Sequence, residues 1–156
     1  MTNQEKVVAK LKEKGFHISF AESCTAGLAA ARLVDVPSAS SVLDTAFVTY
    51  ANEAKMRYAH VQAETLSRFG AVSEGVAGEM AAGCAREAGA EVGVGISGIA
   101  GPGGGTPEKP VGTVCFGFFI NGELQTCTCH FGEEKTREEI RRASVAFVYE
   151  KLAELL

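Results

Sequence analysis

The order of apolar and polar positions predicts helices that alternate with strands from the start of the chain. Thr2 and Glu5 form a capping-box pattern, and the apolar residues after them recur at helical spacing as far as Gly15. Residues 16–22 are mostly apolar and predict a buried strand, whereas residues 23–34 are rich in alanine and predict a helix.

The middle of the chain continues this alternation. Residues 41–50 predict a second strand, and residues 51–61 and 63–70 predict two short helices. A longer helix is expected over residues 73–88, where small and apolar side chains fall at helical spacing, and residues 91–97 predict a third strand.

The last third of the chain predicts a hairpin and a final helix. Residues 111–120 and 123–131 flank an Asn-Gly pair at 121–122, which is a strong hairpin signal, and Thr136 begins a capping-box helix. Helices that alternate with apolar strands, followed by one hairpin, predict an α/β fold. We expect a three-layer α/β/α sandwich with a mixed, mostly parallel sheet, in which residues 1–156 form a single domain.

Composition excludes several classes of function. Hydrophobic residues make up 46% of the chain and charged residues 22%, which is typical of a globular protein. The net charge is −4 and no basic block occurs, so nucleic acid is not an expected partner. The N-terminus lacks the apolar core of a signal peptide and no apolar run is long enough to span a bilayer, so we expect no membrane association and a cytoplasmic location. A homodimer is expected only because soluble enzymes commonly form two-fold dimers.

Five cysteines raise the question of a metal site. Cys127, Cys129 and His130 lie close in sequence, and the spacing of the two cysteines puts them on one face of a strand. No second pair of ligands follows at zinc-site spacing, so strand packing is the expected role, and neither a metal nor a cofactor is expected.

Chemistry is expected beyond the carboxyl ends of the strands, where open α/β sheets bind ligands. The segment AESCTAG passes from a strand to a helix at Ser23. Backbone N–H groups near Cys24 and Thr25 could there face an oxyanion or a phosphate. The alternative is that Ser23 or Thr25 is only the N-cap of the helix.

The segment TYANEAK follows the second predicted strand. Tyr50, Asn52, Glu53 and Lys55 crowd six positions, and a lysine beside a serine can activate the hydroxyl once desolvation has lowered the pKa of the amine. The alternative is the start of a helix with a solvated Glu–Lys pair.

The segment SGIAGPGGGTPEKPVG offers many backbone donors, chiefly at Gly98, Gly101, Gly103 and Gly104, which suits an anionic ligand. It fits neither phosphate-loop fingerprint, and an ordinary loop remains the alternative.

A serine–histidine–aspartate relay is not favoured. The only histidines are His17, His60 and His130, the only aspartates are Asp35 and Asp44, and none lies in a recognisable nucleophile motif.

The segments AESCTAG, FVTYANEAK, GAVSEGVA and SGIAGPGGGTPEKPVGTV, in this order, resemble the C-terminal domain of the CinA proteins, which also occurs alone as nicotinamide-nucleotide amidase. The resemblance implies an α/β/α fold and hydrolysis of nicotinamide mononucleotide to nicotinic acid mononucleotide and ammonia, in pyridine-nucleotide salvage. Two residues depart from the family pattern: Ala26 stands where a glycine is usual, and Phe20 where a threonine is usual.

The resemblance also implies residue roles. Ser23 matches the proposed nucleophile, with Tyr50 and Lys55 as its hydroxyl and amine partners, and Arg137 matches a basic residue that could meet the phosphate. The substrate-binding positions expected from the segments together are Cys24, Thr25, Ser41, Asn52, Ser97, Gly98, Gly101, Gly103, Gly104 and Arg137.

These residues suggest a mechanism without a metal. Neutral Lys55 would take the proton of Ser23, directly or through Tyr50, and Ser23 would attack the carboxamide carbon or position a water that does so. A nucleotide-binding module without catalysis is the alternative from a different class, and a domain that associates with a partner protein is a third.

Overall fold

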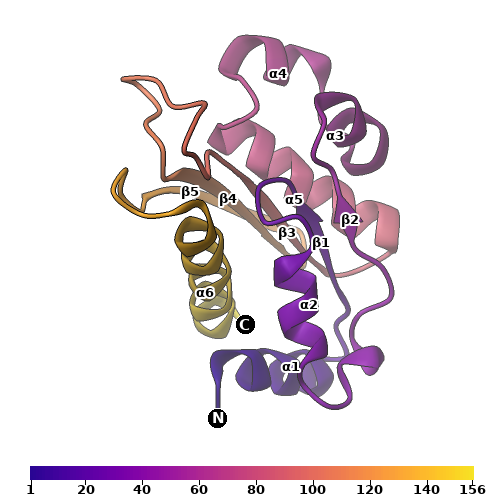
Figure 1. Cartoon of the computed structure of the whole chain (residues 1–156). Coiled ribbons are helices and arrows are strands. Elements are labelled where there is room, and N and C mark those ends of the chain that lie inside the picture. The colour runs from indigo at the N-terminus through magenta and orange to yellow at the C-terminus, as the bar shows by residue number, and fades with distance from the viewer.

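The computed structural model describes all residues, Met1–Leu156, and is built on one five-stranded sheet (Figure 1). The strands lie in the order β2-β1-β3-β4-β5, and β1 is parallel to both β2 and β3. Strand β4 is antiparallel to β3 and to β5, so it alone runs against the other four. The predicted mixed, mostly parallel sheet is therefore confirmed. The strands are β1 (Ile18–Glu22), β2 (Phe47–Val48), β3 (Val92–Gly98), β4 (Thr113–Ile120) and β5 (Glu123–His130).

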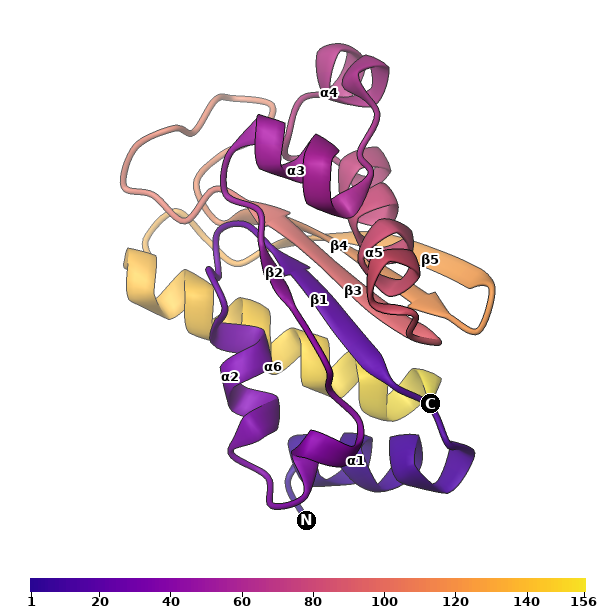
Figure 2. The same cartoon turned by 90° about the vertical axis from the view of Figure 1, so that its right-hand side faces the viewer.

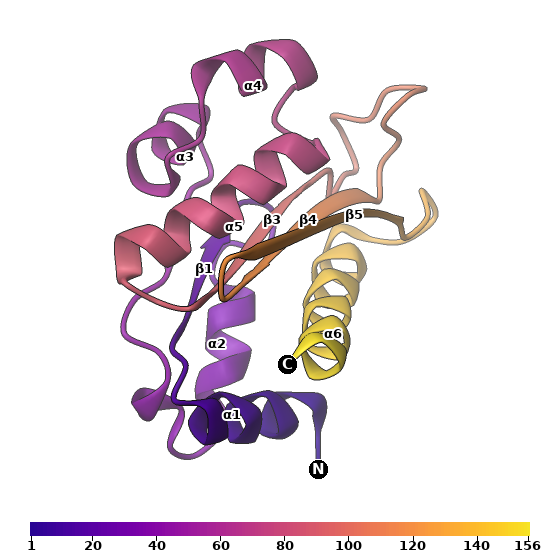
Figure 3. The same ribbon diagram turned by 180° about the vertical axis from the view of Figure 1, so that it is seen from behind.

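Helices cover both faces of the sheet, which makes the three predicted layers. Figures 2 and 3 show the sheet between α5 on one face and α6 on the other. The helices of the first face are α3 (Asn52–Ala59), α4 (Ala63–Phe69) and α5 (Glu74–Ala88). Those of the second face are α1 (Asn3–Lys14), α2 (Leu28–Val34) and α6 (Arg137–Leu155). No helix combines the length and apolarity that crossing a membrane requires.

The main core lies between the sheet and α1, α2 and α6. Successive side chains of a strand point to opposite faces, so Val92, Val94 and Ile96 of β3 enter this core of 22 buried residues. The glycines between them lie directly under α5: a Cβ at Gly95 would come within 2.1 Å of the Ala77 carbonyl oxygen. The absence of side chains on this face therefore lets α5 pack directly on the strand backbone.

The hairpin of β4 and β5 forms as its Asn-Gly turn predicts. Asn121 and Gly122 both adopt positive φ, 47° and 94°, as a tight hairpin turn requires. Cys127 and Cys129 of β5 pack against the main core, which confirms the expected strand packing. No group of three or more His, Cys, Asp and Glu side chains is placed to hold a metal ion.

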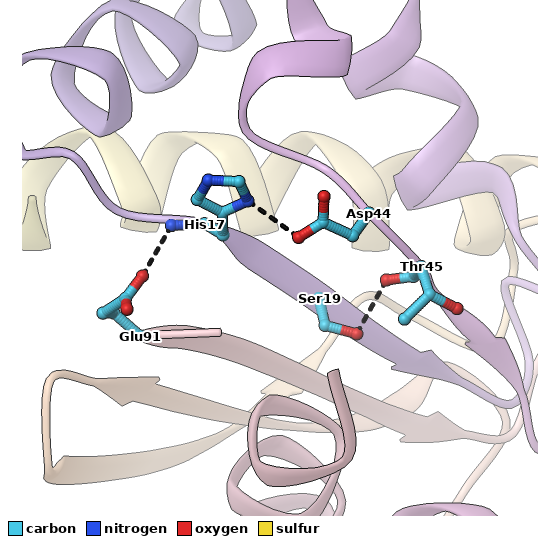
Figure 4. A network of polar contacts seen from close by, with 5 residues as sticks. All are labelled: His17, Ser19, Asp44, Thr45 and Glu91. Atoms are coloured by element: carbon cyan, nitrogen blue, oxygen red, sulfur yellow. Dashed lines mark hydrogen bonds and ion pairs between the residues drawn. The ribbon is translucent and has the colours of Figure 1, made fainter. Parts of the chain in front are cut away.

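The predicted strand over residues 41–50 is mostly wrong. Residues Ala39–Ser41 form a 3-10 helix, and only Phe47–Val48 pair with β1 in regular register. The segment between them follows the edge of β1 through single contacts, such as the bond from the Ser19 hydroxyl to the Thr45 carbonyl (Figure 4). A side-chain donor here replaces part of the ladder that a regular strand would need.

Helix α3 packs closely against α5. A Cβ at Gly83 of α5 would lie 1.6 Å from the backbone oxygen of Ala59, the last residue of α3. No side chain fits there, so α3 lies directly on α5.

Replacement of Gly83 by alanine should therefore displace α3. We expect Gly83→Ala to lower the free energy of unfolding by about 2–3 kcal/mol, because the obstructing atom belongs to the backbone. Urea unfolding measures the change. The matched control is Gly103→Ala, whose added Cβ has nothing within 4 Å and should change the value by less than about 0.5 kcal/mol. Equal unfolding free energies for the two variants would contradict this account.

Candidate active site

Glu22, the last residue of β1, and Ser23, which follows it, point to opposite faces of the sheet. Glu22 bonds to the first residues of α2, whereas Ser23 contacts Lys55 of α3. The Ser23 N–H donates to the Ile96 carbonyl of β3 at 2.9 Å, which ties the end of β1 to the middle of the sheet. The Ser23 hydroxyl therefore leaves a rigid strand end and points to the α3 side.

Lys55 is buried, and the three acceptors of its amine all belong to neutral groups. Its side chain is 1% exposed, although α3 lies at the surface. Nζ donates to Ser23 Oγ at 3.1 Å and to the carbonyl oxygens of Thr49 and Tyr50, each at 2.9 Å. No carboxylate lies within 4.0 Å to form an ion pair. The alternative of a solvated Glu–Lys pair is therefore wrong.

Burial shifts Lys55 toward the neutral amine, and its hydrogen-bond partners determine where the lone pair of that amine points. Burial lowers the pKa of Lys55, although the nearby Cys24 thiol acts in the opposite direction. A neutral amine has two N–H groups and one lone pair, while the carbonyl oxygens of Thr49 and Tyr50 can only accept. Two N–H groups on the carbonyls leave the lone pair for Ser23, whose hydroxyl can donate. The geometry thus suits Lys55 to remove the proton of Ser23.

The Cys24 thiol also reaches the site, but it is a poor nucleophile there. Burial raises the pKa of Cys24 to about 11, so the thiol stays protonated at neutral pH. The Ser23 hydroxyl, in contact with an amine, is the better candidate.

A turn separates Ser23 from the helix that follows it. Ala26 and Gly27 adopt left-handed φ values of 48° and 96°, and the Ala26 N–H donates to the Ser23 carbonyl at 3.0 Å. Helix α2 then begins at Leu28 with Gly27 as its N-cap and no side-chain cap. The alternative in which Ser23 or Thr25 caps the helix is therefore wrong. Ala26 also stands at a φ that the usual glycine of the family would adopt without strain.

Glu22 occupies the donors at the start of α2. Its carboxylate is fully buried and accepts from the Thr25 hydroxyl at 2.6 Å and from the N–H groups of Ala29 and Ala30 at 2.9 and 3.0 Å. Sequence reasoning missed this residue, although a charge at the end of an apolar strand was a usable signal. The N–H groups of Cys24 and Thr25 remain, because neither donates a hydrogen bond to another residue.

Beside Ser23 lies a pocket of about 240 Å³. Arg137 crosses it: Nη1 donates to the Gly101 carbonyl at 2.6 Å and Nη2 to the Tyr50 hydroxyl at 2.9 Å. Tyr50 reaches Lys55 only through its backbone carbonyl, so its hydroxyl does not link Lys55 to Ser23. The lining residues are Ser23, Cys24, Tyr50, Gly98, Ile99, Ala100, Gly101, Gly103, Gly104 and Arg137.

Four expected substrate-binding residues do not line this pocket. Thr25 is buried and its hydroxyl donates to Glu22, and the Ser97 hydroxyl donates to the Ala71 carbonyl at 2.7 Å. Asn52 is exposed in the first turn of α3. Ser41 lies at the opposite end of β1, because its neighbour Val42 accepts from the first residue of that strand. The expectation that Ser41 lines the pocket is therefore wrong; its segment is the 3-10 turn described above.

The opposite end of β1 also holds a histidine–aspartate pair (Figure 4). His17 Nδ1 lies 2.8 Å from an Asp44 oxygen, and the His17 N–H donates to Glu91. The length of the strand separates this pair from Ser23, so it forms no relay with that hydroxyl.

A larger cavity of about 540 Å³ lies between the start of α5 and strands β4 and β5. Its polar side chains include Glu74 and His130, but no serine in it meets a lysine. The smaller pocket, where the Ser23 hydroxyl contacts Lys55, is therefore the better candidate for the active site.

Fold and site together define an α/β protein in which a serine hydroxyl meets a buried lysine amine at the carboxyl ends of parallel strands. Residues 1–156 match the CinA C-terminal domain. The chain belongs to this family.

Relatives agree with this assignment. A CinA-like protein of Kosmotoga olearia is 45% identical over 150 residues, which are 96% of this chain and 36% of the relative. The chain thus spans about a third of the length of that curated relative. Among solved structures, the competence/damage inducible protein CihA of Agrobacterium tumefaciens is 39% identical with a TM-score of 0.92, over 99% of this chain and 96% of that one. A CinA superfamily protein of Escherichia coli is 34% identical with a TM-score of 0.94, over 99% and 88%.

Loss of the Glu22 charge should loosen the turn that carries Ser23. We expect Glu22→Gln to lower the free energy of unfolding by about 2 kcal/mol, because an amide cannot accept from all three donors. Chemical denaturation checks this value against Glu53→Gln, an exposed glutamate of α3 that should change it by less than about 0.5 kcal/mol. A Glu22→Gln variant as stable as this control would show that the cap contributes little.

Proposed function

We propose that this chain hydrolyses the carboxamide of nicotinamide mononucleotide, yielding nicotinic acid mononucleotide and ammonia, as an enzyme of pyridine-nucleotide salvage. The observation that carries the proposal is the contact between the buried Lys55 amine and the Ser23 hydroxyl. Membership of the CinA C-terminal domain family supports the choice of substrate.

In the first step, the Ser23 hydroxyl adds to the carboxamide carbon. Lys55 takes the hydroxyl proton directly, a bond forms between Oγ and the carbon, and the carbonyl π electrons move to the oxygen. The N–H group of Cys24, which follows Ser23 in the chain, lines the pocket and has no acceptor in the protein, is the donor for that oxygen. One such donor is typically worth about 2.7–4 kcal/mol to the transition state.

The tetrahedral intermediate then loses ammonia. The carbon–nitrogen bond breaks, the departing nitrogen takes the proton from Lys55, and Ser23 is left as an ester. Water attacks this ester with Lys55 again as the base, which releases the carboxylic acid and restores the hydroxyl. Direct attack by a water held on Ser23 would give the same products without an ester.

Arg137 and the glycine loop orient the nucleotide rather than take part in bond chemistry. Arg137 uses two of its five N–H donors on Gly101 and Tyr50, which leaves others for a phosphate. The Tyr50 ring, more than half exposed beside the pocket, offers a face to the cationic pyridine ring.

Removal of the Ser23 hydroxyl should abolish turnover. We expect Ser23→Ala to release ammonia from nicotinamide mononucleotide at less than about a thousandth of the wild-type rate, as losses of catalytic nucleophiles do. Ser41→Ala at the far end of β1 is the matched control and should keep the wild-type rate. Circular dichroism verifies that both variants are folded.

Two results would redirect the proposal. Turnover by Ser23→Ala close to that of the wild type would overturn the nucleophile. A folded wild-type chain that binds the nucleotide in calorimetry but releases no ammonia would favour the nucleotide-binding module.

The pH dependence of turnover should report Lys55. Because the base must be neutral and burial lowers its pKa, kcat/KM should rise with pH and level off below the usual lysine pKa of about 10.4. Lys55→Arg keeps a long cationic side chain that does not lose its proton, so it should cost at least about a thousandfold in kcat/KM. A Lys55→Arg enzyme with measurable turnover and an unchanged pH profile would exclude Lys55 as the base.

A further inference from the structure

Arg141 holds the turn that follows Ser23, although no sequence argument singled it out. It lies on α6 one turn after Arg137 and is half-buried. Its Nε donates to the Cys24 carbonyl and its Nη2 to the Thr25 carbonyl, each at 3.0 Å. Two consecutive carbonyls are thus held by one rigid guanidinium group.

This contact fixes the turn that contains the Cys24 N–H. Arg141 holds the Cys24 and Thr25 carbonyls, and the Ala26 N–H donates to the Ser23 carbonyl at 3.0 Å. In a trans peptide the N–H is directed opposite to the carbonyl of the same unit, so the Cys24 N–H points away from the Ser23 oxygen and from the hydrogen bond inside the turn. Cys24 also lines the pocket beside Ser23.

The Cys24 N–H lacks an acceptor inside the protein. Cys24 is only 5% exposed and lines the pocket, yet its N–H donates to no other residue. Buried backbone donors are nearly always paired, so an unpaired donor next to the nucleophile indicates a ligand atom at that point. The start of α2 cannot serve instead, since Glu22 already occupies its donors.

We propose that Arg141 is a positioning residue: it holds the turn at residues 24–25 so that the Cys24 N–H binds the oxygen that becomes negatively charged when Ser23 attacks. Arg141 touches neither substrate nor reacting atoms and acts only through the backbone. The substrate rests on the proposed function, but the oxyanion site applies to any electrophile that Ser23 attacks.

The first test separates turnover from binding. Donors that bind the oxyanion act in the transition state, so Arg141→Ala should lower kcat about 100-fold and leave KM within about threefold. Arg141→Lys, which can reach only one carbonyl at a time, should fall between this variant and the wild type. Arg142→Ala is the matched control, because its exposed guanidinium meets only Glu138, at 2.7 Å, and it should keep the wild-type kcat.

The second test does not depend on the nucleotide. A small fluorophosphonate reacts with Ser23: a bond forms between Oγ and phosphorus, fluoride leaves, and Lys55 takes the hydroxyl proton. The phosphoryl oxygen occupies the same oxyanion site, so mass spectrometry should show labelling of Ser23 slowed in Arg141→Ala by about the factor seen in kcat. Thermal unfolding of each variant shows whether a loss follows folding instead.

The outcomes are distinct. Slower labelling of folded Arg141→Ala supports the inference even if no variant, nor the wild type, releases ammonia, in which case only the proposed substrate fails. Wild-type labelling and kcat in Arg141→Ala would overturn the role of Arg141, as would a loss confined to KM or one that matches the unfolded fraction. No labelling of the wild-type chain would overturn the reactive Ser23 on which the inference depends.

Discussion

The site depends on one buried lysine amine that has no counter-ion. Removing a charged group from water is costly, and the cost is tolerable only where the group is fully hydrogen-bonded or becomes neutral. Lys55 is hydrogen-bonded to three acceptors, none of which is a carboxylate, and burial lowers its pKa toward the neutral form. This arrangement requires α3 to lie directly on α5, and it requires β1 to end where Ser23 can face the amine. The contact between Ser23 and Lys55 therefore depends on the close approach at Gly83 and on the register of β1.

Side chains along β1 alternate between the two faces of the sheet, so the adjacent residues Glu22 and Ser23 have different roles. Glu22 points to one face and holds the start of α2, while Ser23 points to the other and meets Lys55. A shift of the strand by one residue would exchange the two side chains, leaving a carboxylate against the amine. The two parallel neighbours of β1 and the bond from Ser23 to Ile96 fix the register against such a shift.

Much of the fold could be predicted because it is encoded locally. The capping boxes at Thr2 and Thr136, the Asn-Gly turn and the apolar strands all lie where the pattern indicated. The strand over residues 41–50 failed because an edge segment can satisfy its backbone with side chains and single contacts. No local signal distinguishes these contacts from a ladder.

The site was predictable only in part, for physical reasons. Ser23 and the glycine loop follow apolar strands, and the ends of parallel strands meet at one edge of a sheet. The burial of Lys55 depends on how α3 packs, which its sequence does not show. The residues alone therefore left two roles open for Lys55, and the family resemblance chose between them. Arg141 left a weak signal: it lies four residues after Arg137, on the same face as the buried Ser144, Val145 and Val148.

The position of Glu22 also limits where a substrate phosphate can bind. A helix start ordinarily attracts anions, but here a fully buried carboxylate takes the N–H groups of Ala29 and Ala30 and cancels the positive end of α2. A phosphate would meet like charge there. The pocket offers a phosphate the backbone of the glycine loop and the free N–H groups of Arg137 instead. The proposed nucleotide, with its amide at Ser23, would therefore extend toward Arg137, so the carboxylate that anchors the turn after Ser23 would also set the direction in which that substrate binds.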